Sequence, residues 1–299
     1  MLKILNLCKS YGQRLVLQDL TLHIESQEIY GLLGANGAGK TTTINIICNL
    51  IKADQGQISI NNKPLSLQSK TLIGVAPQSN LLYQSLTCEE NLNFFAQIYG
   101  LSRQERKEKI KESLAAVNLL ERAKSPVETL SGGMQRKLNI ASAIVHHPKL
   151  LILDEPTTGL DIEAKYEIWE LISRLKSQGI TILLTTHILE EAERLCDRMG
   201  ILKKGSIIAE GSLTDLRHFM PAQEIVIVKT TEEQKAIEIG NKHGLIHRYY
   251  GNDLAFWLNE HLDLKEIISM FAAIDLDSVS RQPVRLEHIY LELNHKFDC

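Results

Sequence analysis

The residues with the clearest chemical potential form a glycine-rich loop near the start of the chain. Gly34-Ala-Asn-Gly-Ala-Gly-Lys-Thr41 has one glycine, four residues, and then Gly-Lys followed by Ser or Thr. Glycines let successive backbone N–H groups turn inward around phosphates, Lys40 can reach the β- and γ-phosphates of a nucleotide, and the Thr41 hydroxyl can coordinate Mg²⁺. The apolar run 29–33 precedes the loop and helical spacing follows over 41–50. This strand, loop and helix order is what a phosphate-binding loop requires.

Two adjacent carboxylates follow a second apolar run. Residues 150–153 are continuously apolar and lead directly into Asp154 and Glu155. Ligands bind at the carboxyl ends of the strands in a doubly wound sheet, so both carboxylates would face a bound nucleotide. Asp154 would bind Mg²⁺ directly or through water, and Glu155 would accept a proton from an attacking water. Alone, Asp-Glu after an apolar run more often marks a turn, but the phosphate loop favours the catalytic interpretation.

A third segment, Leu130-Ser-Gly-Gly133, precedes a run with apolar residues at helical spacing. Ser131 is a suitable N-cap for that helix. A well-capped helix start explains the serine but not two glycines, each of which costs up to about 1 kcal/mol relative to alanine within a helix. The paired glycines expose backbone amides and indicate that an anion approaches there. Because the chain has one phosphate loop, this second surface would complete a site on another molecule.

The secondary structure that must position these groups is predicted to differ from one segment of the chain to the next. Residues 2–33 are predicted to be short β-segments, 78–145 mainly helical, and 150–186 strand, helix and strand. Strands interleaved with helices imply a mainly parallel sheet covered on both faces. We therefore predict an α/β fold with a mainly parallel core sheet, an antiparallel β-subdomain and a helical subdomain at about 78–145, all within residues 1–220. Residues 221–299 are predicted to form a small C-terminal α+β domain.

Composition narrows the classes of partner. Apolar residues make up 44% of the chain and charged residues 23%, which is typical of a globular protein. The formal net charge of -3 gives no reason to expect nucleic acid as a partner. The five cysteines are far apart and never in a Cys-x-x-Cys pair, which favours a reducing cytosol over a disulfide framework or a zinc site. No stretch approaches the roughly 18 apolar residues of a spanning helix, so any membrane-crossing segment would belong to another chain.

The order of these motifs resembles the nucleotide-binding subunit of ATP-binding cassette (ABC) transporters. The resemblance covers about residues 2–217. It is carried by the phosphate loop, Gln78 after Ala76-Pro77, Leu-Ser-Gly-Gly at 130–133, Leu-Asp-Glu-Pro at 153–156, Gly159-Leu-Asp161 and Thr186-His187. The amino-acid sequences of 132–137 and 286–293 are similar to those of exporter cassettes, drug-resistance types included, that work with a separate permease. The sequence departs from this family pattern at Ile162, since a proline often follows the Gly-Leu-Asp segment. The departure puts the stiffness of that loop in doubt, but not hydrolysis.

The resemblance implies roles that spacing alone does not give. Tyr11 would stack on adenine, Gln78 would sense Mg²⁺ and the attacking water, and His187 would contact the γ-phosphate. Taken alone, a tyrosine before a turn more often packs, and a lone histidine is more often structural. His146 and His147, which precede Pro148, are most simply helix-end cations or surface groups.

Further roles fall on the segments that would face a second cassette. Ser131 and Gly133 match groups that hold the γ-phosphate of ATP bound to the other phosphate loop, and Asp161 matches a loop that communicates between the two sites. The expected catalytic residues are Glu155, His187 and Gln78, and the expected metal ligands are Thr41, Gln78 and Asp154. The expected nucleotide-binding residues are Tyr11, Gly34, Asn36, Gly37, Ala38, Gly39, Lys40, Thr41, Thr42, Ser131, Gly132, Gly133 and Asp161.

The function implied is that of an ATP-hydrolysing subunit, with ATP and Mg²⁺ as cofactors, on the cytoplasmic face of the membrane. Two copies, in a homodimer or heterodimer, would close head to tail around ATP and power a separate transmembrane permease, here of an exporter. The groove beside Gln78, with apolar residues such as Phe94 or Phe95, would receive the permease's cytoplasmic helix. The alternative for those phenylalanines is the core of the helical subdomain.

A second class of function is a soluble ABC-type ATPase that acts on ribosomes or nucleic acid, and a third is a cytosolic assembly factor. Proteins of the second class usually carry two cassettes or DNA-binding insertions. This sequence has one cassette, no basic surplus and no long coiled-coil insertion, which favours the transporter subunit. The C-terminal region could regulate, dimerise or brace the cassette, and its residues leave these alternatives open.

Overall fold

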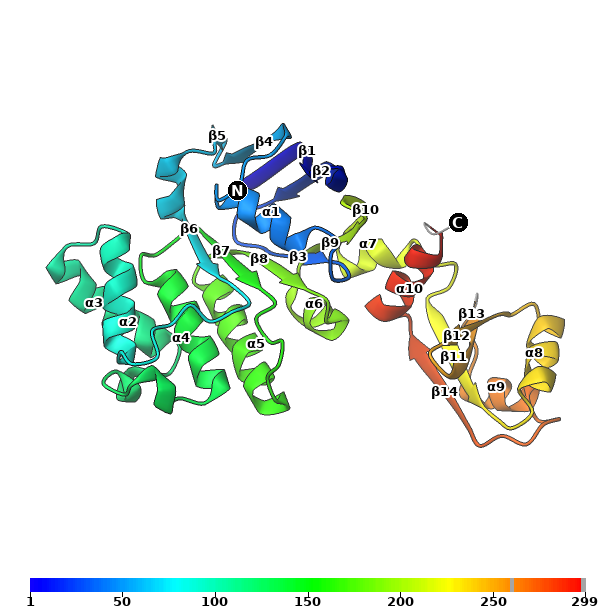
Figure 1. The fold of residues 1–299 in the computed structure, drawn as a ribbon. Helices are drawn as coiled ribbons and strands as arrows, with labels where there is room; N and C mark the ends of the chain where they lie inside the picture. Colours follow the sequence, from blue (N-terminus) through cyan, green and yellow to red (C-terminus); the bar gives the residue numbers. More distant parts are fainter. Residues whose placement is uncertain (259–260, 297–299) are drawn as a thin grey trace. The chain divides into compact units, whose positions relative to one another are not determined.

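The computed structural model describes residues 1–258 and 261–296, with the side chain of Leu67 outside the description. The chain forms two compact units, Met1–Ser212 and Leu213–Cys299 (Figure 1). The sequence predicts the boundary between residues 220 and 221. Helix α7 (Leu213–Arg217) instead belongs to the second unit, where it contacts α10 (Leu286–Lys296). Arg217 Nε also donates a hydrogen bond to the Val284 carbonyl of that unit.

Two expectations from composition can be compared with the described residues. The described cysteines are Cys8, Cys48, Cys88 and Cys196, and all four are free. Cys299 lies outside the described residues. Within the described ranges, none of the helices combines the length and hydropathy needed to span a bilayer.

The first unit begins with the predicted antiparallel sheet, in the order β2-β1-β4-β5. Its strands are β1 (Leu2–Tyr11), β2 (Arg14–Ile24), β4 (Gln55–Ile60) and β5 (Lys63–Pro64). Gly12 takes φ +60° in the tight turn between β1 and β2, a conformation that suits glycine. This turn pairs Tyr11 with Arg14 at the end of the hairpin.

The core sheet is mainly parallel, as predicted, in the order β10-β9-β3-β8-β7-β6. Its parallel strands are β3 (Ile29–Leu33), β6 (Ile73–Ala76), β7 (Leu150–Asp154), β8 (Thr181–Thr186) and β9 (Arg198–Lys203). The edge strand β10 (Ser206–Gly211) is antiparallel to β9. Every residue of β3, β7 and β8 is buried, which explains why β3 and residues 150–153 of β7 are continuous apolar runs.

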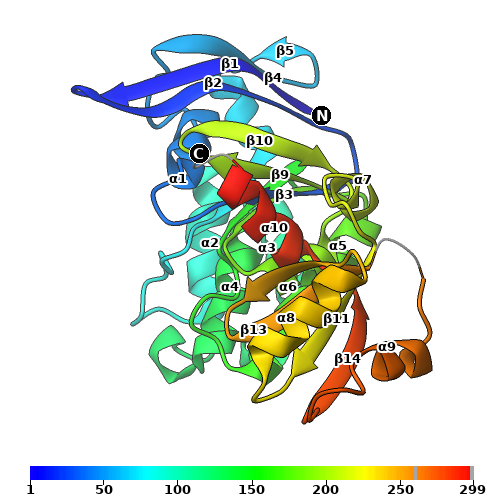
Figure 2. The same ribbon diagram turned by 90° about the vertical axis from the view of Figure 1, so that its right-hand side faces the viewer.

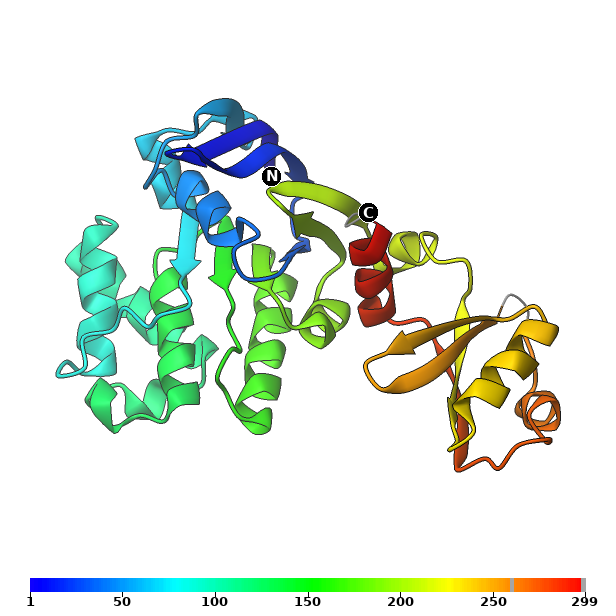
Figure 3. The same ribbon diagram turned by 45° about the vertical axis from the view of Figure 1, so that its right-hand side comes forward.

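Layers on both faces bury this sheet (Figures 1 and 3). Alternate residues of β7 separate the faces: Ile152 packs with α1 (Lys40–Ile47) and the antiparallel sheet, and Leu153 packs in the cluster on the other side. That second cluster includes residues of three helices, α4 (Gly132–Ile144), α5 (Ile162–Ser177) and α6 (Leu189–Leu195). The carboxyl ends of the strands therefore emerge at one edge, framed by helices.

The helical subdomain contains α2 (Cys88–Ile98), α3 (Arg103–Ala116) and α4, with 3₁₀ turns η2 (Leu120–Arg122) and η3 (Val127–Thr129). A further 3₁₀ turn, η1 (Leu67–Leu72), precedes β6. Capping boxes start two of these helices, with Thr87 at α2 and Ser102 at α3.

The structure differs from two predictions about side chains in this subdomain. Phe95 packs against the core and Phe94 is half-buried against Tyr83 with ring centroids 4.9 Å apart, so neither is exposed. His146 stacks on Tyr99 with ring centroids 3.5 Å apart, and burial lowers its pKa to about 4. The prediction of a helix-end cation is wrong for His146, whereas His147 is exposed.

The second unit is an α+β domain, as predicted. Its antiparallel sheet has the order β12-β13-β11-β14 (Figure 2). The strands are β11 (Glu224–Lys229), β12 (Ile246–Tyr250), β13 (Asp253–Leu258) and β14 (Ser278–Pro283), and α8 (Glu233–Lys242) and α9 (Leu264–Met270) cover one face. Gly240 allows α8 to approach the sheet, because a Cβ there would lie 2.2 Å from the Phe256 ring.

Candidate active site

The glycine loop lies between β3 and α1, as its spacing predicts. Gly37 and Gly39 have φ values of +83° and +117°, which turn the backbone before α1 begins at Lys40. Gly39 also packs closely, because a Cβ there would meet Leu17 Cδ2 at 2.6 Å. The Lys40 side chain is buried, and its Nζ donates hydrogen bonds to the carbonyls of Gly34 at 2.7 Å and Ala35 at 3.3 Å. The loop thus holds a buried cation at the N-terminus of a helix, which favours an anion.

Glu155 is the centre of the site, and four polar groups from separate segments surround its carboxylate. Gln78 Nε2 donates to Oε2 at 2.9 Å, and Thr158 Oγ1 donates to the same oxygen at 3.2 Å. On the other oxygen, His187 Nδ1 lies at 3.1 Å and Lys40 Nζ at 3.7 Å. Glu155 itself is 7% exposed and takes φ +49°, in the left-handed region. The predicted catalytic residues are therefore joined directly, although Gln78 and Glu155 lie far apart in sequence.

Asp154 lies beside this cluster at the end of β7. Its Oδ1 accepts a hydrogen bond from Thr185 Oγ1 at 2.5 Å. Burial is the main cause that raises the pKa of Asp154, and the nearby Glu155 raises it further. The hydrogen bond from Thr185 and the charges of Lys40 and Arg136 lower the pKa but do not reverse the shift. A divalent cation at this carboxylate would favour its ionised form.

The residues present fit a magnesium ion that takes most of its ligands from phosphate and water. The candidate ligands are one carboxylate, Asp154, one hydroxyl, Thr41, and one amide, Gln78. The described residues contain no group of three or more His, Cys, Asp or Glu side chains that could hold a metal on their own.

Comparisons with known proteins agree with this geometry. The family model described as ABC transporter matches residues 17–158. The chain is 43% identical over 219 residues to the linearmycin resistance ATP-binding protein LnrL of Bacillus subtilis (strain 168), which covers 72% of this chain and 70% of that protein. It is 44% identical over 207 residues to the Nod factor export ATP-binding protein I of Rhizobium sp. (strain N33), which covers 68% of each.

The chain belongs to the family of ABC transporter ATP-binding proteins. Its structure is also similar to a dimeric ATP-binding cassette in a post-hydrolysis state bound to ADP and Pi. The TM-score is 0.63 and the identity 29%, over 71% of this chain and 98% of that one. The expected cassette fold is confirmed, and the chain is an ATPase subunit of an ABC transporter that binds and hydrolyses ATP.

Not every predicted site residue of the cassette lies in the Glu155 cluster. Tyr11 is half exposed at the end of β1, with Lys9 Nζ 5.8 Å from its ring centroid. Ser131 caps α4 by accepting a hydrogen bond from Met134 N at 3.3 Å. Asp161 caps α5 in the same way, because its Oδ1 accepts a hydrogen bond from Ala164 N at 2.8 Å. Among the described residues, no hydrogen bond or ion pair connects 131–133 or Asp161 to the phosphate loop.

The two glycines that follow Ser131 differ in what surrounds them. A Cβ at Gly133 would lie 2.9 Å from the Ala164 Cβ on α5, so close helix packing explains this glycine. A Cβ at Gly132 would meet nothing within 4 Å. The anion interpretation of the paired glycines therefore depends on Gly132, whose N–H lies at the exposed end of α4.

Sequence reasoning did not single out Arg136 or Thr185. Arg136 is buried on α4, and its guanidinium donates to the carbonyls of Pro77 at 3.0 Å and Gln78 at 2.7 Å. Asn139 Nδ2 donates to the same Pro77 carbonyl at 3.1 Å. The helix that follows the Ser-Gly-Gly segment thus holds the backbone that carries Gln78.

Proposed function

We propose that this ABC cassette powers a separate transmembrane permease in the direction of export. ABC ATP-binding subunits work with transmembrane partners, and the names of two relatives refer to linearmycin resistance and to Nod factor export. We further propose that the cassette works on the cytoplasmic face of the membrane, where ATP is supplied.

The observation that carries the proposal is the convergence of Lys40, Gln78 and His187 on the carboxylate of Glu155. A carboxylate held by such donors is placed to accept a proton from a water that attacks the γ-phosphate. Lys40 would bind the β- and γ-phosphates, and His187 would contact the γ-phosphate. Thr41, Gln78 and Asp154 would hold Mg²⁺, which neutralises charge that develops on the phosphates. Tyr11 and the rest of the loop, through Asn36, Ala38 and Thr42, would bind the nucleotide.

We propose that two cassettes close head to tail, so that each site takes 34–42 from one copy and Ser131 to Gly133 from the other. The dimeric cassette with which this chain shares its fold supports such an assembly. Ser131 and Gly132 are exposed and unconnected to the phosphate loop of their own chain, which also supports it. Asp161 would face the second copy. ATP would stabilise the closed form, and loss of the γ-phosphate would allow the copies to separate.

The permease is proposed to contact the segment that follows Gln78. Leu81 is 61% exposed and Tyr83 is 48% exposed in this segment, so they replace Phe94 and Phe95 as the candidate apolar contacts. Gln78 connects the segment to the site, because its side chain contacts Glu155 and its carbonyl accepts from Arg136. A shift of this segment would therefore reach the catalytic carboxylate.

The decisive test is Glu155→Gln. We expect turnover to fall by about 100- to 10,000-fold, since general base catalysis typically contributes that much, while nucleotide binding persists. Size-exclusion chromatography with Mg²⁺ and ATP should then show a stable dimer. Glu170→Gln, which alters an exposed acid on α5, is the control and should behave like the wild type. Turnover at the wild-type rate in Glu155→Gln would refute the base assignment, and a persistent monomer at high concentration would refute the shared site.

A further inference from the structure

Glu191 on α6 is a fully buried acid that the roles above do not use. Its Oε1 accepts a hydrogen bond from Thr157 Oγ1 at 2.7 Å and another from Trp169 Nε1 at 3.1 Å. Burial raises the pKa of Glu191, although hydrogen bonds from Thr186, Thr157 and Trp169 act in the opposite direction. A carboxyl in such surroundings is costly, and it persists where its hydrogen bonds fix a specific arrangement.

The partners of Glu191 lie next to the catalytic groups in the chain. Thr157 comes two residues after Glu155, and the Thr186 side chain, which accepts a hydrogen bond from Ile188 N, directly precedes His187. Trp169 is on the inner side of α5 and is 3% exposed. A single carboxyl therefore bonds both to the segment after the proposed base and to α5, and it stands on α6, which begins two residues after His187.

A closed ring of contacts connects these segments. Thr157 is bonded to Glu191, and its neighbour Thr158 donates to Glu155 Oε2. The other oxygen of Glu155 contacts His187, and the helix that carries Glu191, α6, begins two residues after that histidine. A displacement of Thr157 would move the Glu155 side chain relative to His187.

We propose that Glu191 is a positioning residue for ATP hydrolysis. It fixes the turn 155–158 against the end of β8, so that Glu155 Oε1 and His187 Nδ1 stay 3.1 Å apart. The inference depends on the roles proposed above for Glu155 and His187. Removal of the carboxyl should therefore impair turnover more than nucleotide binding, because Glu191 touches neither the phosphate loop nor the predicted adenine contact.

The test compares Glu191→Ala with Glu191→Gln in the full-length chain. Glu191→Ala should lower kcat at least about tenfold, the effect of one lost buried hydrogen bond, with little change in the KM for ATP. Glu191→Gln should restore most of the loss, because the amide oxygen can accept from both Thr157 and Trp169. Glu190→Ala is the matched control, since this neighbouring acid is exposed.

A double-mutant cycle separates positioning from a general loss of stability. If Glu191 acts through His187, then Glu191→Ala should cost little further activity in a His187→Ala background. An equal proportional loss in both backgrounds would overturn the inference. Should Glu191→Ala not fold, Thr157→Val removes one bond to the same carboxyl and serves in the same cycle.

The failure of this inference can be distinguished from failure of the proposed function. Full turnover in Glu191→Ala, alongside an inactive Glu155→Gln, would overturn only the role of Glu191. Full turnover in Glu155→Gln would instead refute the base assignment on which that role depends.

Discussion

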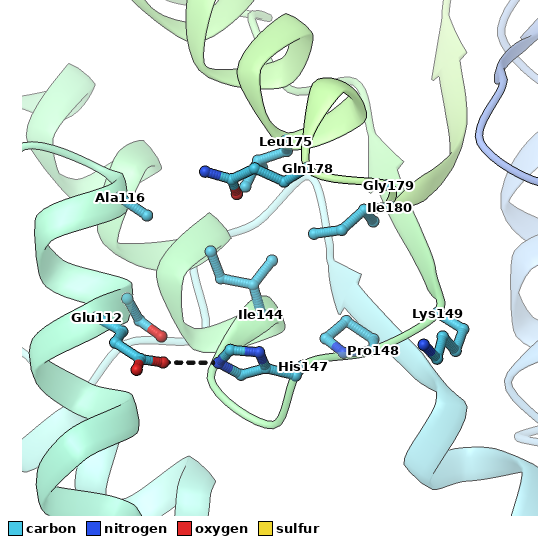
Figure 4. A pocket seen from close by; sticks show the side chains of 11 residues that line it. Glu112, Ala116, Ile144, His147, Pro148, Lys149, Leu175, Gln178, Gly179 and Ile180 are labelled. Carbon is cyan, nitrogen blue, oxygen red and sulfur yellow. Dashed lines mark ion pairs between the residues drawn. The ribbon is translucent and has the colours of Figure 1, made fainter.

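The two ends of the core sheet differ in how they accommodate charged side chains. At the carboxyl end, Lys40, Asp154 and Glu155 are all buried and lie within one cluster. At the amino end lies a cavity of about 400 Å³, shown in Figure 4, between the ends of α3, α4 and α5. Its lining includes the apolar side chains of Ala116, Ile144, Pro148, Leu175 and Ile180 and the uncharged polar side chains of Ser113 and Gln178. Its charged residues, Glu112, His147 and Lys149, are exposed.

The difference shows which feature marks function in this fold. His147 Nε2 and Glu112 Oε2 are 3.2 Å apart, but both side chains are about half exposed, so water weakens their attraction. Burial of a charge costs several kcal/mol unless other groups compensate. Glu28, beside the amino end of β3, is also buried, but it is a single acid with Arg198 at 3.4 Å, whereas the nucleotide end gathers a lysine and two acids in one cluster. The cluster of buried charges, rather than the presence of a cavity, identifies the site.

The largest contrast between the two ends is expected for their lysines. Lys40→Ala removes the buried cation of the phosphate loop, and nucleotide affinity should fall about 10- to 100-fold, the usual value of a charge-assisted hydrogen bond. Lys149→Ala, which alters the exposed lysine at the cavity, should leave affinity unchanged. Titration calorimetry with ATP measures both. Equal effects of the two substitutions would contradict the distinction between the ends.

A smaller effect, on stability, is expected for Asp154→Asn. Since the folded-state pKa of Asp154 lies above the ordinary value of 3.8, the nucleotide-free wild type loses stability as the pH rises above that value. The amide cannot ionise and can still accept from Thr185, so the variant avoids this loss. We expect its midpoint of thermal unfolding at neutral pH to be higher by about 2 to 4 °C. Below pH 3.8 the two proteins should converge.

Magnesium with ATP should reverse the order of the unfolding midpoints of the wild type and Asp154→Asn. Mg²⁺ with ATP should raise the unfolding midpoint of the wild type more than that of Asp154→Asn, because only the carboxylate can bind the ion strongly. Scanning calorimetry with and without Mg²⁺ and ATP measures both effects. A variant that is less stable than the wild type without nucleotide at neutral pH would show that Asp154 is a structural charge rather than a strained ligand.

The sequence predicted those parts of the fold that depend on local pattern. Helix α5 lies between two strands, as predicted for residues 150–186, because its N-cap and apolar spacing are local signals. The core strands were recognisable because they are buried on both faces.

The site was predictable in its members but not in all of its contacts. Motif order identified Gln78, Glu155 and His187, yet their direct contacts arise from long-range packing of β6, β7 and β8. The contacts of Arg136 with backbone carbonyls leave no pattern in the sequence, since any helix can present an arginine to a carbonyl. Roles that require a second copy, such as those of Ser131 and Asp161, remain predictions.

The smallest expected effect belongs to the exposed pair at the amino end. Glu112→Gln removes the charge that contacts His147 and Lys109, and the free energy of unfolding should change by no more than about 1 kcal/mol, as for other exposed ion pairs. ATP turnover should stay at the wild-type rate, because the cavity lies at the opposite end of the strands from Glu155. Denaturant unfolding and a steady-state ATPase assay check the two expectations. A marked loss of turnover with unchanged stability would show that the amino end communicates with the nucleotide site, and the contrast between the two ends would then have to be abandoned.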